Sequence, residues 1–165
     1  GWRITFTLHS ATPRAPHRAS TRRVIETTIL ETPVHRLVRE QIQTDAAPEP
    51  IGPYSQGIRD GGTVYVSGQG PADPDTREVL AEGIRDQTAQ VLDNVDAVLD
   101  EAGTSLDRVV RGTVYLADMD DYDGMNDVYA ERMPEPYPAR AAVEVGRLPG
   151  PFRVEISAIA RLPGE

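Results

Sequence analysis

The side chains that could do chemistry in this sequence are arginines, carboxylates and hydroxyl groups. Cysteine is absent, and all three histidines fall within the first 37 residues. The remaining body therefore has no thiol nucleophile and no imidazole to serve as a general base. It also contains neither a G-x-S-x-G nucleophile elbow nor a phosphate-binding G-x-x-x-x-G-K loop. Any chemistry has to rest on charged and hydroxyl side chains.

Aspartates gather in the second half of the chain, at Asp118, Asp120, Asp121, Asp123 and Asp127. Their spacing departs from a calcium-binding loop, because a glycine stands at position 124 and the bidentate glutamate that ends an EF-hand loop is missing. Acidic residues in such a group are typical of the start of a helix, where they cap free N–H groups. We therefore expect helix capping here and no metal site.

Five short segments stand out together by their order and spacing. They are 51–56 (IGPYSQ), 66–69 (VSGQ), 126–129 (NDVY), 137–143 (YPARAAV) and 154–160 (VEISAIA). This set resembles the Rid family, the reactive-intermediate deaminases, over residues from about 40 to 162. The resemblance implies a chorismate-mutase-like fold that assembles as a homotrimeric barrel with active sites in clefts between subunits. It also implies hydrolysis of 2-aminoacrylate-type enamines and 2-imino acids to 2-keto acids and ammonia, with no cofactor or metal.

Under this resemblance, Arg140 and Glu155 are the candidate catalytic residues. Arg140 matches the family arginine, and a planar guanidinium can bind a substrate carboxylate through two parallel hydrogen bonds, which lysine cannot. Glu155 matches a family glutamate near the imine carbon, where a carboxylate can orient water or relay a proton. By residue type alone, Arg140 could instead form an ion pair between strands, and Glu155 could be a carboxylate in solvent.

Five further residues are candidate substrate-binding positions: Tyr54, Ser67, Gly68, Asn126 and Ala142. Tyr54 would cover the ligand, or would only pack beside its proline neighbour. Ser67 and Gly68 would offer a hydroxyl and an amide to a ligand oxygen, or would only form a turn. Asn126 could hydrogen-bond across an interface or cap local backbone. Alanine at 141 and 142, where many members carry a hydroxyl residue or cysteine, and serine at 157 in place of a second glutamate leave the substrate range open.

The elements that would position these residues follow a β-β-β-α-β-α-β-β order. Strands are predicted at 40–44, 55–59, 63–67, 108–117, 139–145 and 152–160, with a hairpin turn across 60–62. Apolar side chains recur at helical spacing over 84–102, and Gly103 stops that helix. A second amphipathic helix is predicted over 120–133. This makes an α/β (α+β) domain with a single mixed sheet and two helices that can cover only one of its faces.

Alternation in the last two predicted strands divides their side chains between the two faces of the sheet. One set is predicted to lie under the helices: Ala141, Val143, Val145, Val154, Ile156 and Ala158. The other set is predicted on the opposite face: Arg140, Ala142, Glu144, Arg153, Glu155 and Ser157. From the pattern alone, this partly charged face could be solvated or could meet other subunits. The resemblance favours a subunit interface.

Charge divides the chain into two parts. Residues 1–37 are rich in arginine, which would suit a transit peptide, but they lack periodicity, an apolar region and a cleavage pattern, which favours a disordered extension ahead of a domain at 38–165. Residues 40–165 hold ten arginines against 24 acidic residues, a net charge of −14. Such a body repels phosphate backbones, so nucleic acid is not an expected partner. The lack of an apolar run of about 18 residues predicts no membrane span, and the lack of cysteine fits a cytoplasmic protein.

Two functions fit these observations. The first is an enzyme, a hydrolase like 2-iminobutanoate/2-iminopropanoate deaminase. The second is a non-catalytic trimer of the same fold that binds keto or imino acids, since binding alone also needs Arg140. A ribonuclease or translation inhibitor, functions also attached to this family, is disfavoured by the acidic body and by the lack of a basic groove or stacking aromatics.

Overall fold

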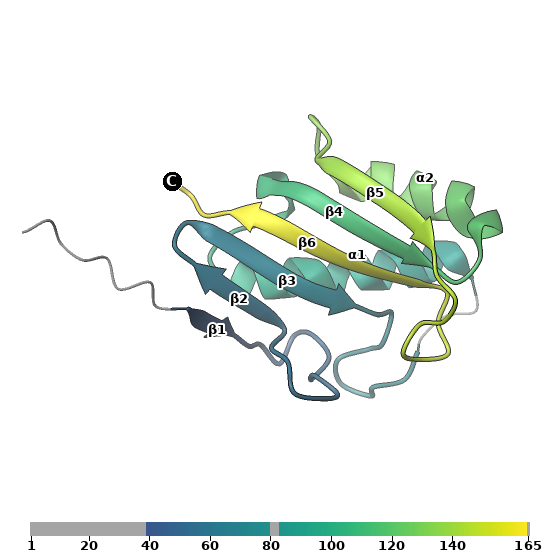
Figure 1. The fold of residues 1–165 in the computed structure, drawn as a ribbon, viewed down its shortest axis with the longest axis horizontal. Helices are drawn as coiled ribbons and strands as arrows, with labels where there is room; N and C mark the ends of the chain where they lie inside the picture. The colour runs from purple at the N-terminus through teal and green to yellow at the C-terminus, as the bar shows by residue number, and fades with distance from the viewer. Residues whose placement is uncertain (1–38, 80–82, 165) are drawn as a thin grey trace, which may run out of the picture. The chain divides into compact units, whose positions relative to one another are not determined.

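The computed structural model of the chain describes residues 39–79 and 83–164, which form one six-stranded mixed sheet with two α-helices (Figure 1). The element order confirms the predicted β-β-β-α-β-α-β-β. The disorder predicted for residues 1–37 lies outside the described residues. In chain order, the elements are β1 (Glu40–Ile42), β2 (Gly57–Asp60), β3 (Thr63–Gln69), α1 (Ile84–Glu101), the 3-10 turn η1 (Leu106–Arg108), β4 (Val109–Leu116), the 3-10 turn η2 (Met119–Asp121), α2 (Tyr122–Arg132), β5 (Ala139–Glu144) and β6 (Val154–Arg161).

The strands lie in the order β1-β2-β3-β6-β4-β5, so the C-terminal strand is inserted between β3 and β4. Neighbours are antiparallel except β4 and β5, which run parallel and are joined through α2. The predicted hairpin is present: Asp60 pairs with Thr63, and Gly61 in the turn has a φ of 56°, which favours glycine. The pairing of β3 with β6 shifts register between Val66 and Gln69, so that residues 67 and 68 form a bulge.

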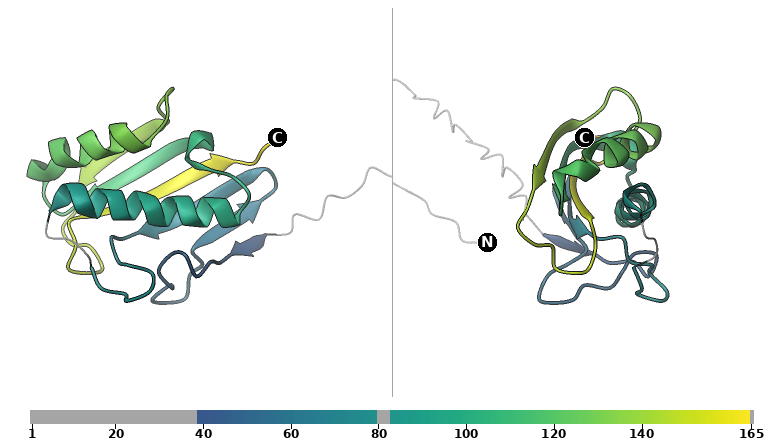
Figure 2. Two further views of the ribbon diagram at one scale, coloured as in Figure 1. Left: turned by 180° about the vertical axis from the view of Figure 1, so that it is seen from behind. Right: turned by 90° about the vertical axis from the view of Figure 1, so that its right-hand side faces the viewer.

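Both helices pack on the same face of the sheet (Figure 2). Helix α1 presents a stripe of fully buried side chains to the sheet, consisting of Val91, Leu92, Val95, Val98 and Leu99. Burying each such side chain contributes about 1.5–3 kcal/mol. The helical spacing predicted over 84–102 is confirmed by this stripe. Within the described residues, no helix combines the length and the apolar character that a membrane span needs.

The predicted face assignment is confirmed in β6 and wrong in β5. Val154, Ile156 and Ala158 are buried beneath the helices. In β5, however, Val143 is 42% exposed, whereas Ala142 packs on the core and Arg140 contacts α2. Because Arg140 hydrogen-bonds to Asn126 of α2, the alternate set of side chains in β5, which is the more apolar one, lies on the face that no described helix covers. The residues placed on the wrong face by the prediction are Arg140, Ala141, Ala142, Val143 and Glu144.

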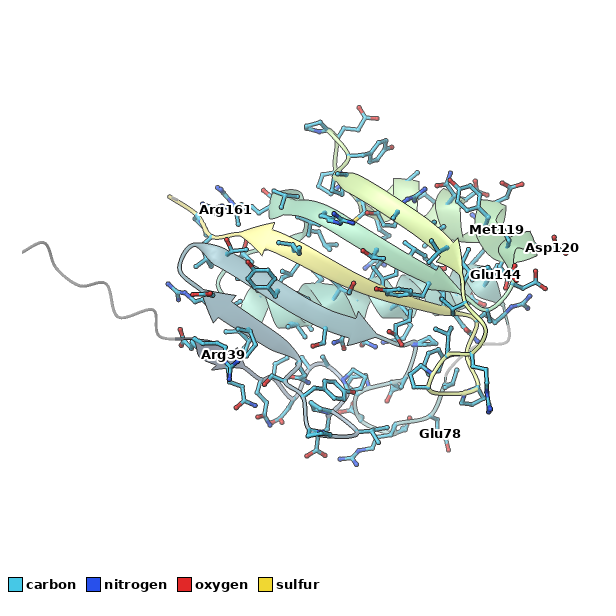
Figure 3. All side chains as sticks on the ribbon, in the orientation of Figure 1. Arg39, Glu78, Met119, Asp120, Glu144 and Arg161 are labelled. Atoms are coloured by element: carbon cyan, nitrogen blue, oxygen red, sulfur yellow. The ribbon has the colours of Figure 1, made fainter. Side chains whose placement is uncertain are left out.

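The start of α2 is fastened to the sheet by charged groups. Asp121 is buried and accepts hydrogen bonds from Nε and Nη2 of Arg153, both at 2.7 Å. Arg153 comes just before β6 in the chain, and its side chain binds Asp121 of η2. The prediction that it stands on the open face of the sheet is wrong. Glu144, at the end of β5, accepts a hydrogen bond of 2.9 Å from the N–H of Met119 (Figure 3). These contacts fix the position of α2 over β4 and β5.

Candidate active site

Arg140 lies on the helix face of β5 and is held by three side chains of α2. Its Nη2 atom donates hydrogen bonds to Oδ1 of Asn126 (2.7 Å) and to Oη of Tyr122 (3.1 Å). Its guanidinium carbon lies 4.5 Å from the centre of the Tyr129 ring, which is a cation–π distance. Positions 122, 126 and 129 are separated by four and three residues, so they project from one face of the helix. We call these four residues the arginine cradle.

Gly112 makes room for the arginine cradle. It is the β4 partner of Arg140, and a Cβ atom at this position would lie only 2.9 Å from Oη of Tyr129. Tyr129 is 4% exposed, and its hydroxyl has no hydrogen-bond partner within the described residues. Burial raises the pKa of Tyr129, against a smaller lowering by Arg140. The phenol therefore stays neutral and supports the guanidinium through its ring face, without using any N–H donor.

The remaining donors of Arg140 are available to a ligand. Nε and Nη1 have no hydrogen-bond partner within residues 39–79 and 83–164. A half-buried guanidinium with free N–H groups is suited to bind a planar anion such as a carboxylate. Ala142 stands two residues further along the same side of β5, where it is partly buried against the core.

Glu155 lies on the open face of β6, against the bulge in β3. A Cβ atom at Gly68 would lie 2.7 Å from Cδ of Glu155 and closer still to Oε1, so a larger residue at this position would displace the carboxylate. The side chain is half-buried, and burial raises the pKa of its carboxyl above the ordinary value. No described residue donates a hydrogen bond to it. A carboxylate in this state is suited to take a proton from water.

Ser67 ties the bulge to the loop that carries Tyr54. Its Oγ donates a hydrogen bond of 2.7 Å to the carbonyl oxygen of Ser55, and its N–H donates one of 2.9 Å to that of Gln56. Tyr54 is 49% exposed, and its hydroxyl accepts a hydrogen bond from the N–H of Ile51 (3.3 Å). Ser67, Gly68 and Glu155 thus form a second cluster, which we call the Glu155 cluster. The loop that carries Tyr54 is attached to it.

The sheet separates the arginine cradle from the Glu155 cluster within one chain. Arg140 pairs with Gly112 on the helix face, whereas Glu155 pairs with Tyr115 on the opposite face. The predicted site residues are therefore brought into two places: Arg140, Asn126 and Ala142 in one, and Glu155, Ser67 and Gly68 in the other. A single chain does not place the two candidate catalytic residues beside one substrate.

Tyr122, Tyr129 and Gly112 were not predicted as part of a site. The sequence places both tyrosines on the apolar face of a helix, and their spacing around Asn126 was a usable signal, because all three must share one face. Gly112 gave no local signal, since its role arises only from the parallel register of β4 and β5.

The aspartates near η2 act at a helix start. The carboxylate of Asp118 accepts a hydrogen bond of 2.9 Å from the N–H of Asp120, which confirms the capping role for that residue. In the part of the chain that the structure describes, no three histidine, aspartate or glutamate side chains gather in a way that could hold a metal ion.

Comparison with known proteins gives consistent matches over this domain. A family model described as Endoribonuclease L-PSP matches residues 44–162. A RutC family protein of Pyrococcus horikoshii is 53% identical over 123 residues, which cover 74% of this chain and 98% of that protein. The 2-iminobutanoate/2-iminopropanoate deaminase of Bos taurus is 44% identical over 124 residues, which cover 75% of this chain and 90% of the bovine protein.

Solved structures agree with these sequence matches. RidA from an Antarctic Psychrobacter superposes with a TM-score of 0.73 at 47% identity, covering 75% of this chain and all of that one. TdcF of E. coli, solved with bound serine, superposes with a TM-score of 0.69 at 38% identity, covering 74% of this chain and 98% of TdcF. The matched range, the shared fold and the sequence identities together show that the chain belongs to the Rid family.

Proposed function

We propose that this protein is a hydrolytic deaminase that converts 2-aminoacrylate-type enamines and 2-imino acids to 2-keto acids and ammonia. The observation that carries the proposal is the state of Arg140: α2 holds its guanidinium, while its Nε and Nη1 donors have no partner among the described residues. Each of these donors forms a parallel pair with Nη2, and such a pair is the geometry in which a guanidinium binds the carboxylate that every 2-imino acid has. Relatives named 2-iminobutanoate/2-iminopropanoate deaminase, at 40% to 44% identity, support the same reaction.

In the proposed reaction, an enamine first takes a proton from solvent at its methylene carbon and becomes an iminium ion. Water attacks C2 of the iminium ion while the Glu155 carboxylate takes one of the water protons, which gives a carbinolamine with a neutral amino group and an ionised carboxylate. Glu155 returns this proton to the amino nitrogen. The C–N bond then breaks, ammonia leaves, and the hydroxyl proton is lost to solvent as the keto group forms. A carboxyl whose pKa is raised by burial suits both proton transfers.

We further propose that the site is shared between subunits of a homotrimer, with the arginine cradle of one chain facing the Glu155 cluster of another. Two observations support this arrangement. The first is that the sheet separates the two clusters within one chain, while Arg140 lies on the edge strand β5, where a neighbouring subunit can reach it. In addition, Tyr65 (47% exposed) and Val143 (42% exposed) leave large apolar side chains on the face that no described helix covers.

The test is the rate of 2-keto acid formation from an imine produced in place by a serine or threonine dehydratase. The protein should raise this rate above that of spontaneous hydrolysis. Glu155→Gln, which keeps the size but cannot take a proton, should abolish most of the acceleration. Glu101→Gln, at an exposed carboxylate at the end of α1, is the matched control and should keep it. Binding of 2-keto acid without any acceleration would instead support the non-catalytic binding protein.

An endoribonuclease activity, which the description of the matching family names, does not fit the charge of this chain. A nuclease must attract a phosphate backbone, and residues 40–165 carry a net charge of −14.

A further inference from the structure

We infer that Tyr122 is a second ligand of the substrate carboxylate, and that it exchanges its hydrogen bond with Arg140 for one with the substrate. This inference rests on the proposed function and adds a residue to it. It begins at Nη2 of Arg140, which carries two protons. This atom already donates hydrogen bonds to Oδ1 of Asn126 at 2.7 Å and to Oη of Tyr122 at 3.1 Å.

A carboxylate that binds arginine through two parallel hydrogen bonds has to use Nη2. The two parallel pairs of donors on a guanidinium are Nε with Nη2 and Nη1 with Nη2. Both pairs therefore include Nη2, the atom that already binds two side chains of α2. When a carboxylate arrives in this geometry, one of the two α2 acceptors has to give up its share of Nη2.

Tyr122 is the acceptor that can leave at little cost. Its hydrogen bond to Nη2 is the longer of the two, and a hydroxyl can rotate and change from acceptor to donor, which the amide oxygen of Asn126 cannot. The hydroxyl proton of Tyr122 has no acceptor within the described residues. After the exchange this proton points to the carboxylate, so that Tyr122 and Arg140 bind the same anion from adjacent positions.

The test is Tyr122→Phe, which keeps the ring and removes only the hydroxyl. We expect 2-oxobutanoate, a stable 2-keto acid, to bind about ten- to a hundredfold more weakly in calorimetric titration, because one hydrogen bond to a charged group is lost. The value of kcat/KM for the imine should fall by a similar factor, and Tm should not change. Tyr137→Phe, at an exposed tyrosine in the loop before β5, is the control and should bind as the wild type does.

Two results would overturn the inference. If Tyr122 only blocks the arginine, loss of the hydroxyl frees Nη2 and the keto acid binds more tightly. If the hydroxyl is only structural, the Kd stays unchanged and Tm falls. Titration of Arg140→Ala with 2-oxobutanoate separates this inference from the proposed function. If Arg140→Ala loses binding while Tyr122→Phe binds as the wild type does, only the role of Tyr122 is refuted. If Arg140→Ala binds 2-oxobutanoate as tightly as the wild type does, the assignment of the carboxylate site to Arg140 is refuted.

Discussion

Gly68→Ala tests whether the position of the Glu155 carboxylate matters for catalysis. The added Cβ atom would lie 2.7 Å from Cδ of Glu155, and an ordinary contact begins at 3.4 Å, so the carboxyl carbon has to move by at least about 0.7 Å and its nearer oxygen by more. A displacement of about 1 Å at a reacting group can lower the rate on the order of a hundredfold. The backbone at Gly68 does not have a positive φ, and the displaced carboxylate is the end of a flexible side chain. Stability should therefore change little.

The assay is kcat/KM for imine hydrolysis, measured beside Tm. Gly146→Ala is the matched control, because a Cβ atom there meets nothing within 4 Å and the residue has no positive φ; it should leave both quantities unchanged. If the loss acts through Glu155, the double variant Gly68→Ala/Glu155→Gln should be no slower than Glu155→Gln alone. Full activity in Gly68→Ala, or losses that add in the double variant, would refute the role assigned to this contact.

Three further predictions concern charge and assembly. Arg140→Lys keeps the charge but loses the parallel donors, so kcat/KM should fall about ten- to a thousandfold while Tm persists; a fully active, well-folded Arg140→Ala protein would contradict the assignment. Burial raises the pKa of Glu155 in the folded state, so this group favours folding below its unfolded pKa and that contribution is lost as pH rises through the folded pKa. Glu155→Gln should therefore match the wild-type Tm in acid and exceed it at neutral pH, and a lower Tm at neutral pH would count against the buried carboxylate. Sedimentation equilibrium should give about three times the chain mass of 18.0 kDa, and a clean monomer at micromolar concentration would exclude the shared site.

The parts of the fold that depend on local pattern could be predicted from the sequence. Helix α1 repeats its apolar side chains at helical spacing, and β6 alternates strongly between buried and half-buried residues. In β5 the same alternation defines two sets of side chains but does not say which set faces the helices. That choice depends on Gly112 in another strand, which gives Tyr129 and Arg140 the space to pack.

The candidate site shows the same division between local and distant information. Arg140 and Glu155 could be named from the segments that contain them. Their surroundings could not, because the contact of Glu155 with Gly68 depends on a register shift between β3 and β6, and the hold on Arg140 depends on the placement of α2 over β5. Pairing register between distant strands is set by the whole sheet and has no short sequence signature.

The way in which α2 holds Arg140 explains how an edge strand can present an ordered cation without neutralising it. An arginine side chain carries about 2 kcal/mol of rotamer entropy, which a free side chain would lose on binding a ligand. A carboxylate from the protein would order the guanidinium but would also cancel its charge. The arginine cradle uses an amide oxygen, a phenol hydroxyl and an aromatic ring, all neutral, and none of the ion pairs in the described residues involves Arg140. Within the described part of one chain, the guanidinium is thus oriented in advance while its charge has no anionic partner, so a ligand carboxylate can bind it without displacing an anion of the same chain.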